Sequence, residues 1–568
     1  MMHISRITGA LVLGQSLFLG AALVGLPLQA QTDSANSQTP IVAARNLDEA
    51  VNRIIASEND LYKRLKIVHP VVETYIQRMQ KDADFGVVPK TDYYFLGKLD
   101  VSHSVKDDSF IPDPGLPKRM LGVFSHLVSI NFLPGGFATM AMMDPGQFDR
   151  EHYTFNFLRR EFLGDVRCLV FDVLPKEGAG KGRFVGRMWV EDQGYHVVRF
   201  NGTYGGASMN HSYSHFDSWR INCGPDLWLP AYVYTEETSQ KYDLGLKSIQ
   251  FKGQTRLWGY ESKKDRMEED FTNMTVEGVD DKSDSAADNS PVEAMRMWER
   301  QAEDNVIDRL QNADLIAPSG PVNKVLQTVL QNLEVTNNIS VTPDARVRIL
   351  LTTPLESFTL GHTIVISRGL LDVLPDEANL AAVLAHELAH IVLGHQLDTK
   401  YAFADRMFFD DDESFRRIEV GRTAEEEEAA DKKAVEILKK SPYAGKLPQV
   451  GLFLRALSAR SGDMPHLIRP MMGGRLANGK EDQRLTAIMN MAPPLHLTRT
   501  DEIEALPLGS RIKLDPWSDR LQLVKAQNVP LQSVKEKVPF EVTPFMPHLT
   551  RLNQTQSVAA ARGSAASR

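Results

Sequence analysis

The sequence predicts an α+β protein of several domains, with an antiparallel β domain followed by a mainly helical domain that carries a small edge sheet. Three observations support this prediction. The chain of 568 residues is too long for a single hydrophobic core. Short runs with two-residue alternation dominate residues 84–263. After an acidic stretch, apolar residues recur at helical spacing from residue 291 onwards.

Composition and charge narrow the class of protein. The chain is 42% hydrophobic and 24% charged, which is typical of a folded soluble protein. With 73 acidic and 64 basic residues, its formal net charge is -9. A broad surface that neutralises phosphates is therefore not expected, and neither is a nucleic acid partner.

The first thirty residues have the pattern of a secretory signal peptide. Arg6 is followed by an apolar run over 7–30, which ends at the small residue Ala30 before a polar stretch. This order predicts export and cleavage after Ala30. A retained membrane anchor is the alternative, because an apolar run of about 20 residues can span a bilayer. Cys168 and Cys223 are the two cysteines, and their spacing leaves open one disulfide or two separate thiols.

The N-terminal half is predicted to contain a helical segment, a β domain and a linker. Residues 31–83 form the helical segment, on the spacing of "LDEAVNRIIASENDLYKRL". The β-rich domain over 84–263 includes the runs "CLVFDVLP", "RFVGRMWVED" and "HVVRFNGTY". The stretch "GAGKG" between two of these runs lacks the spacing of a phosphate-binding loop and is expected to be a hairpin turn. Residues 264–290 are acidic and are expected to be a linker.

The C-terminal half returns to helical spacing. Within 291–450, "MWERQAEDNVIDRLQ" and "VNKVLQTVLQNLEV" are predicted helices, while "RVRILLTT" and "HTIVISRG" are predicted extended pieces. The apolar helix "AAVLAHELAHIVLGH" follows them. Residues 451–552 are a mixed C-terminal part of the same region, and the tail over 553–568 is expected to be disordered.

Two histidines and a glutamate lie on this apolar helix. His386 and His390 are four residues apart, so both imidazoles project from one face about one turn apart. This geometry suits two of the three protein ligands of a catalytic zinc ion, whose fourth position stays open for water. Glu387 follows the first ligand and can reach that water as a general base.

A later histidine does not supply the third ligand. Position 396, six residues beyond His390, is a glutamine. His395 lies five residues beyond His390, which on a continuous helix is about 140° round the axis. His395 is therefore expected to point away from the metal. It would lie either at the surface or behind a metal-binding residue, in contact with the side of that residue that faces away from the metal.

A second helix offers carboxylates instead. Thr423 begins the stretch "TAEEEEAADKKAVEILKK" with the pattern of a capping box. Glu427 and Asp431 are four residues apart and extend the apolar stripe of this helix toward its start. Buried carboxylates need a cation or hydrogen-bond donors. Glu427 is therefore predicted to be the third metal ligand, and Asp431 to hydrogen-bond a ligand imidazole.

The paired motifs "HELAH" and "EEAAD" resemble the gluzincins of metallopeptidase family forty-eight, which includes the CaaX prenyl endopeptidase, HtpX and BepA. The resemblance covers residues 322–442 and includes the edge strand and "SRGLL" before the motif helix. It implies one Zn²⁺ per chain, held by His386, His390 and Glu427, with Glu387 as the base and Asp431 in support. It also implies that a substrate chain pairs with the extended segment 357–366.

This chain departs from the family pattern at the edge strand. The family often has Asn-Ala-Phe there, and this chain has Ser357, Phe358 and Thr359. The orientation of a substrate does not follow from the motif, and no substrate-binding residue is assigned.

The β domain resembles, more weakly, the fold of LolA, LolB and the RseB sensor, through "GRMWVEDQGYHVVRFNG". This resemblance implies a curved half-barrel that holds acyl chains or an apolar peptide, so a lipoprotein or acyl-chain ligand is one expectation. The alternative is a β module that only packs against the second domain, because two-residue alternation is common to many sheets.

Together these features predict an exported zinc metalloendopeptidase that hydrolyses peptide bonds with a zinc-bound water and a glutamate base. Its partners would be protein or peptide substrates, its location the periplasm, and its role envelope protein quality control or processing. Peripheral association with a membrane is compatible with this interpretation. The alternative is a periplasmic lipoprotein-binding, lipid-binding or chaperone protein whose peptidase-like domain is latent or inactive.

Overall fold

The structure is a computed structural model, and it describes residues 46–82, 86–100, 106–109, 137–180, 182–205, 215–242, 247–260, 303–395, 422–468, 474–475, 485–494, 512–515, 520–523 and 540–551. The predicted signal peptide, the acidic linker and the C-terminal tail lie outside these residues. In the described part of the chain, no helix is long and apolar enough to cross a membrane.

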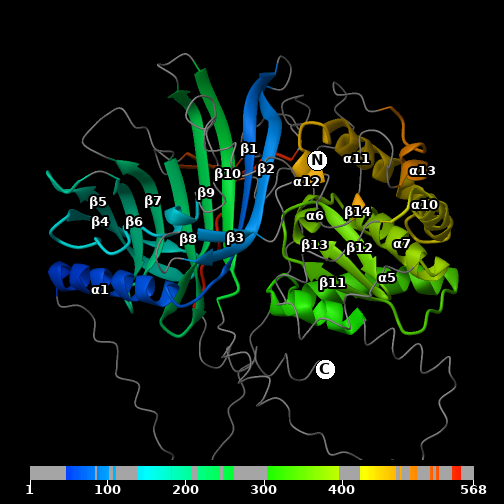
Figure 1. Cartoon of the computed structure of the whole chain (residues 1–568), viewed down its shortest axis with the longest axis horizontal. Helices are drawn as coiled ribbons and strands as arrows, with labels where there is room; N and C mark the ends of the chain where they lie inside the picture. The colour runs from blue at the N-terminus through cyan, green and yellow to red at the C-terminus, as the bar shows by residue number, and fades with distance from the viewer. Residues whose placement is uncertain are drawn as a thin grey trace, which may run out of the picture. The chain divides into compact units, whose positions relative to one another are not determined.

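A ten-stranded antiparallel sheet dominates the first half of the chain (Figure 1). Its strand order is β3-β2-β1-β10-β9-β8-β7-β6-β5-β4, so each strand lies beside a neighbour in sequence except where β1 pairs with β10. The strands are β1 (Val71–Asp82), β2 (Gly86–Asp100), β3 (Lys106–Ser109), β4 (Tyr153–Leu163), β5 (Val166–Pro175), β6 (Arg183–Glu191), β7 (Val197–Gly205), β8 (His215–Gly224), β9 (Leu227–Tyr242) and β10 (Lys247–Trp258).

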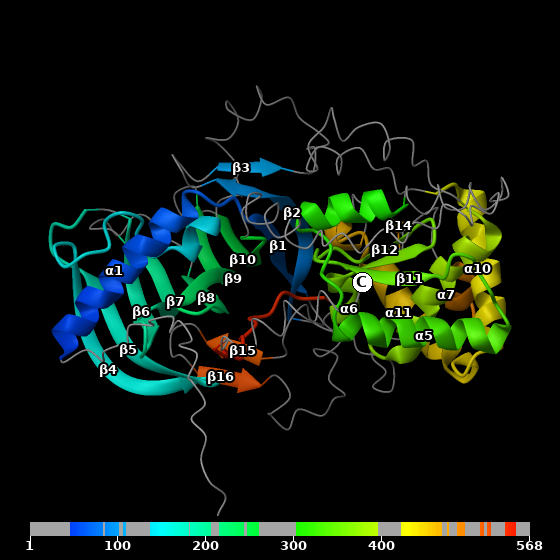
Figure 2. The ribbon, with the colours of Figure 1, turned by 90° about the horizontal axis from the view of Figure 1, so that it is seen from below.

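Both faces of strand β1 are covered. Helix α1 (Leu47–Leu65) crosses one face, as Figures 1 and 2 show, and the 3-10 helix η1 (Ala138–Ala141) packs on the same side. Ile54 of α1 joins Val72 and Ile76 of β1 in that core. Tyr75, on the opposite face of β1, belongs to a second core that continues into the C-terminal half of the chain. Both faces of β1 therefore lie in packed cores.

The sheet begins earlier than the sequence predicts. The segment 31–83 was expected to be helical, and α1 does form within it, but β1 occupies Val71–Asp82. A strand that is covered on both faces has apolar residues on both, so the two-residue alternation that identifies a half-buried strand is weak. Val71 and Tyr75 pack into one core while Val72 and Ile76 pack into the other.

The predicted turn and cysteines can also be placed. The runs over 168–175 and 183–192 are neighbouring antiparallel strands, β5 and β6, and "GAGKG" lies at the connection between them, as predicted. Both cysteines are free thiols: Cys168 is buried and Cys223 is exposed. The structure therefore favours two separate thiols over a disulfide.

The C-terminal region, residues 303–494, combines helices with a four-stranded sheet of order β11-β13-β12-β14. The α+β fold class predicted from the sequence is thus confirmed. A helix over 303–312 precedes the following elements: α5 (Pro321–Asn337), β11 (Arg346–Leu350), β12 (Glu356–Leu360), β13 (Thr363–Ser367), α6 (Arg368–Val373), α7 (Glu377–Leu393), α10 (Ala424–Lys439), η3 (Ala444–Lys446), α11 (Leu447–Arg460), α12 (Pro465–Ile468), β14 (Gly474–Arg475) and α13 (Thr486–Met489). A separate hairpin is formed by β15 (Ile512–Asp515) and β16 (Arg520–Leu523).

Residues 540–551 return to the large sheet. The buried Gln77 of β1 donates to the carbonyl of Phe540 at 2.5 Å and accepts from the amide of Val542 at 2.8 Å. Farther along, the amide of Asp165 donates to the carbonyl of Leu549. These contacts satisfy buried polar groups where two segments far apart in the chain meet.

A buried carboxylate of β2 caps a short helix of the C-terminal region. Asp92 accepts from the backbone amides of His466 and Leu467 at 3.1 and 2.8 Å, and its Oδ1 lies 3.0 Å from Nδ1 of His466. The hydrogen bond to Asp92 raises the pKa of His466. Protonated His466 is therefore more stable in the folded protein than in the unfolded chain.

This ion pair predicts a pH-dependent contribution to stability. Because the folded pKa of His466 is raised, its contribution is complete below the unfolded value of about 6.5 and is lost as pH rises through the folded pKa. We expect urea denaturation to show a larger stability gap between wild type and His466→Asn at about pH 5.5 than at about pH 9. An equal gap at both pH values would contradict this prediction.

Candidate metal centre

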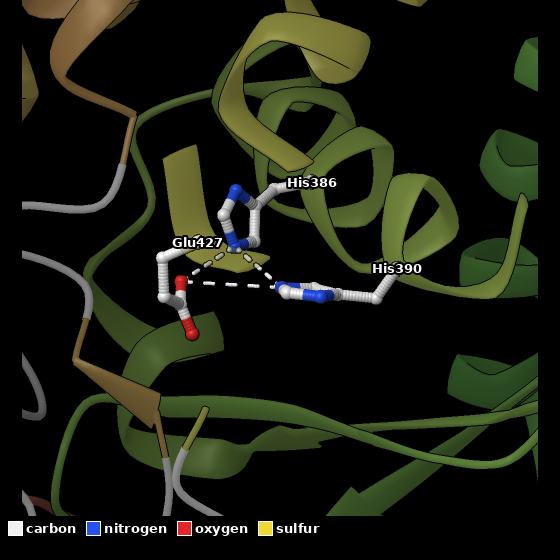
Figure 3. Close-up of side chains that lie close together, drawn as sticks. All are labelled: His386, His390 and Glu427. Atoms are coloured by element: carbon white, nitrogen blue, oxygen red, sulfur yellow. Dashed lines mark hydrogen bonds and ion pairs between the residues drawn. The ribbon is translucent and has the colours of Figure 1, made fainter. Parts of the chain in front are cut away.

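Helix α7 carries the motif and is buried along almost all of its length. Asp376 caps its start by accepting from the amide of Asn379, and Gly394, with a φ of 71°, ends it in the left-handed conformation. Its apolar residues surround the axis, so the helix lies inside the C-terminal region. Within this environment His386 and His390 are both buried and project from one face toward α10 (Figure 3).

Helix α10 brings the carboxylates. Thr423 and Glu426 form the predicted capping box, each accepting from the backbone amide of the other. This cap places Glu427 in the first turn, facing the two histidines (Figure 3). One turn later, Asp431 is buried on the same side of α10.

The three predicted ligands converge. Nε2 of His386 lies 3.1 Å from Oε2 of Glu427 and 3.1 Å from Nε2 of His390, and the remaining pair of atoms is 3.9 Å apart. Ligands placed about 2.1 Å from a tetrahedral metal lie about 3.4 Å from one another. Two imidazole nitrogens and one carboxylate oxygen at these separations, all within 4.8 Å, therefore fit a metal ion with a position left for water.

Asp431 supports the first histidine from behind. Its Oδ1 lies 2.9 Å from Nδ1 of His386, the ring nitrogen that faces away from the other ligands. The two carboxylate oxygens of Asp431 also accept from the backbone amides of Leu485 and Thr486, at the start of α13. Asp431 thereby lies against the His386 ring on the side away from Nε2, where it can orient the ring.

His395 lies against the second histidine on the side that faces away from the metal position, which is one of the two places expected for it. Helix α7 ends at Leu393, and the turn at Gly394 lets the amide of His395 donate back to the carbonyl of His390. Nδ1 of His395 then lies 2.9 Å from Nδ1 of His390. Burial lowers the pKa of His395, so a neutral ring can accept the proton of His390 Nδ1 and keep His390 Nε2 free to bind a metal.

Removing this support should weaken metal binding. Since an outer partner of a ligand imidazole contributes about 10- to 100-fold to metal affinity, we expect His395→Ala to weaken the binding of zinc by that factor. Competition with a chelator of known affinity measures the change. His152, which pairs with Asp149 in the β domain, offers a matched control as His152→Ala. Equal affinity in wild type and His395→Ala would show that His395 does not support His390.

The glutamate beside the ligands is held by the small sheet. Ser357 and Thr359 of β12 place one hydroxyl on each carboxylate oxygen of Glu387, at 2.7 and 2.6 Å. From the sequence, Ser357 and Thr359 were only departures from a family pattern, with no expected role. The sequence could show only that Ser357 and Thr359 share one face of a predicted strand, because residues two apart in a strand do so. On its other edge, β12 pairs with β14 at Glu356 and Ser357.

Comparison with protein families identifies the segment that carries the motif helix. Residues 322–408 match the model described as Peptidase family M48. The resemblance predicted from the paired motifs is thereby confirmed for this segment, and the match supports a metallopeptidase. Glu427 and Asp431 lie beyond the matched residues. No curated protein matches the chain.

Solved structures match the β region. A LolA superfamily protein from Nitrosomonas europaea is 11% identical, with a TM-score of 0.19, over 38% of this chain and 96% of its own. A domain described as an outer membrane lipoprotein-sorting protein, from Vibrio parahaemolyticus, is 10% identical, with a TM-score of 0.17, over 39% and 98%. A complex of MucA and MucB from Pseudomonas aeruginosa matches at 10% identity, with a TM-score of 0.13, over 37% and 94%.

Proposed function

We propose that this protein is an exported zinc-dependent endopeptidase that acts in envelope protein quality control or processing. The observation that carries the proposal is the convergence of His386, His390 and Glu427 beside the buried Glu387. Two histidines and a glutamate are a ligand set of catalytic zinc sites, which keep one position open. A structural zinc site would instead have four protein ligands. Among the described residues, this group has three.

Zinc in this position would polarise the scissile carbonyl and lower the pKa of water. The chain's own contribution is the proton transfer. Glu387 accepts a proton from the attacking water and later delivers it to the nitrogen of the leaving amine. Asp431 and His395 face the Nδ1 atoms of His386 and His390, so each Nε2 would be free to bind the metal.

We further propose that the substrate is an extended protein segment. The edge strand β12 lies next to Glu387 and pairs with β13 on its inner side. A substrate strand could add to the outer edge of β12, where the chain's own β14 already forms two residue pairs. The N-terminal pattern over 1–30 supports export to the periplasm, and the substrate's identity is left to experiment.

The alternative function is a lipid-binding, lipoprotein-binding or chaperone protein with a latent peptidase domain. An apolar cavity between α1 and the large sheet favours it, lined by residues that include Leu65, Leu99, Ala141 and Leu257. This cavity has room for about one water molecule. Holding an acyl chain would therefore require α1 to move away from the sheet.

Metal analysis tests the proposed site. We expect the purified protein to contain about one zinc ion, measured by mass spectrometry. Glu427→Ala should lose most of this zinc, because two imidazoles alone bind zinc weakly. Glu425→Ala is the matched control, since it removes an exposed carboxylate two residues away on the same helix and should retain the zinc. Zinc that is absent from the wild type, or fully kept by Glu427→Ala, would overturn the ligand assignment.

A further inference from the structure

Two hydroxyls of the edge strand form a clamp on Glu387. The hydroxyl of Ser357 lies 2.7 Å from Oε1, and the hydroxyl of Thr359 lies 2.6 Å from Oε2. These are the short distances of hydrogen bonds to an ionised oxygen. An ionised carboxylate only accepts, so the hydroxyls are the donors and each oxygen receives one.

The clamp is buried and its geometry is fixed. Glu387, Ser357 and Thr359 are 0%, 1% and 2% exposed, so solvent does not compete for these hydrogen bonds. The strand itself is held in register, with Ser357 opposite Ile366 and Thr359 opposite Ile364. Because the donors lie two residues apart on one face of a paired strand, the carboxylate plane is set by β12.

The two hydroxyls can keep their hydrogen bonds to Glu387 when its carboxylate gains and loses a proton. A carboxylate has about four acceptor positions, and the two hydroxyls use one on each oxygen. When Glu387 takes a proton on one oxygen, that oxygen can still accept from its hydroxyl. The hydroxyls keep their own protons throughout, and the transferred proton goes to the leaving amine.

We propose that Ser357 and Thr359 are positioning residues that hold Glu387 in the orientation in which it acts as the base. This inference rests on the proposed function, in which Glu387 is that base. Strand β12 would then have two roles. Its backbone would pair with an extended substrate, and the side chains of Ser357 and Thr359 would orient the carboxylate of Glu387. The two hydroxyls donate to Glu387, and the ligand atoms belong to three other residues, so the loss of one hydroxyl should leave metal binding intact.

Kinetics of matched variants test the clamp in the full zinc-loaded protein. Thr359→Val removes one hydroxyl at nearly constant volume, and we expect kcat on unfolded casein to fall about 10- to 100-fold, the range for outer supports of a site. KM and zinc content should change by less than about twofold. Thr359→Ser restores the donor and should recover most of kcat.

The control removes an equally buried hydroxyl that does not touch Glu387. Thr363 of β13 is 0% exposed and its hydroxyl accepts from Arg346, so Thr363→Val should keep kcat within about threefold of wild type. If Thr359→Val does not fold, Ser357→Ala carries the test, with folding checked by thermal denaturation and zinc content.

The outcomes separate this inference from the proposed function. If the wild type shows Glu387-dependent turnover while Thr359→Val and Ser357→Ala both keep wild-type kcat, the clamp has no positioning role. The inference would also be overturned if Thr359→Val raised KM and left kcat unchanged, or if Thr359→Ser did not recover kcat. A zinc-loaded wild type without Glu387-dependent turnover would instead overturn the proposed function, and the positioning role with it.

Discussion

Glu387→Gln is expected to lower peptide hydrolysis by about 100- to 10,000-fold, the range that general acid–base catalysis contributes. Glutamine has nearly the shape of glutamate, so the ligands on either side of it should keep their places. Its amide cannot accept and return the proton. In the wild type, the hydroxyls of Ser357 and Thr359 each donate to one oxygen of the Glu387 carboxylate. Glutamine replaces one of these oxygens with an NH₂ group, which cannot accept a hydrogen bond.

Turnover and zinc content should therefore separate in this variant. Hydrolysis of unfolded casein and zinc content by mass spectrometry are the two measurements. Glu425→Gln makes the same chemical change at an exposed position of α10 and should leave both unchanged. If Glu387→Gln kept full activity in the cell, the binding or chaperone alternative would replace the peptidase proposal.

The largest expected loss of stability comes from the ion pair that joins α1 to the large sheet. Arg220 of β8 is 1% exposed, and both of its terminal nitrogens contact the carboxylate of Glu58, one at 2.8 Å. Glu58 is itself 9% exposed. Glu58→Gln leaves a buried guanidinium without its counter-charge, which costs about 3 to 5 kcal/mol of unfolding free energy. Urea denaturation followed by circular dichroism measures this loss.

A double variant identifies the cause of the loss. Replacing both partners, as Glu58→Leu with Arg220→Met, should recover most of the stability, because neither charge is then buried alone. Asp60→Asn is the control on the same helix, since Asp60 pairs with Arg64 at the surface and should change stability by about 0.5 kcal/mol or less. A loss below about 1 kcal/mol in Glu58→Gln would show that water reaches Arg220.

The sequence alone was sufficient for features that depend on the periodicity of a single element. His386 and His390 share one face because four residues make about one helical turn. The same reasoning put Glu427 and Asp431 on one side of α10, behind the cap at Thr423. The strands β5, β6 and β7 were also predicted, from short runs rich in apolar residues, although burial in β5 and β6 does not strictly alternate.

Features that depend on what packs against an element needed the tertiary structure. Strand β1 lies in a segment expected to be helical, because covering both of its faces removes the alternation by which a strand is identified. His395 points away from the metal position, as expected, and the end of α7 at Gly394 decides that it contacts His390 rather than lying free at the surface.

Helix periodicity was enough to propose the metal ligands, the base and Asp431 beside them, whereas the contacts of Ser357 and Thr359 with Glu387 could not be predicted. Ser357 and Thr359 lie about thirty residues from Glu387 in the chain, and nothing in a strand's periodicity says which helix its hydroxyls will meet. The same holds for Gln77, whose partners Phe540 and Val542 come from the far end of the chain. Local geometry repeats with each turn or pleat and is therefore encoded within a short stretch. Contacts between distant segments are decided by which faces the whole chain buries together.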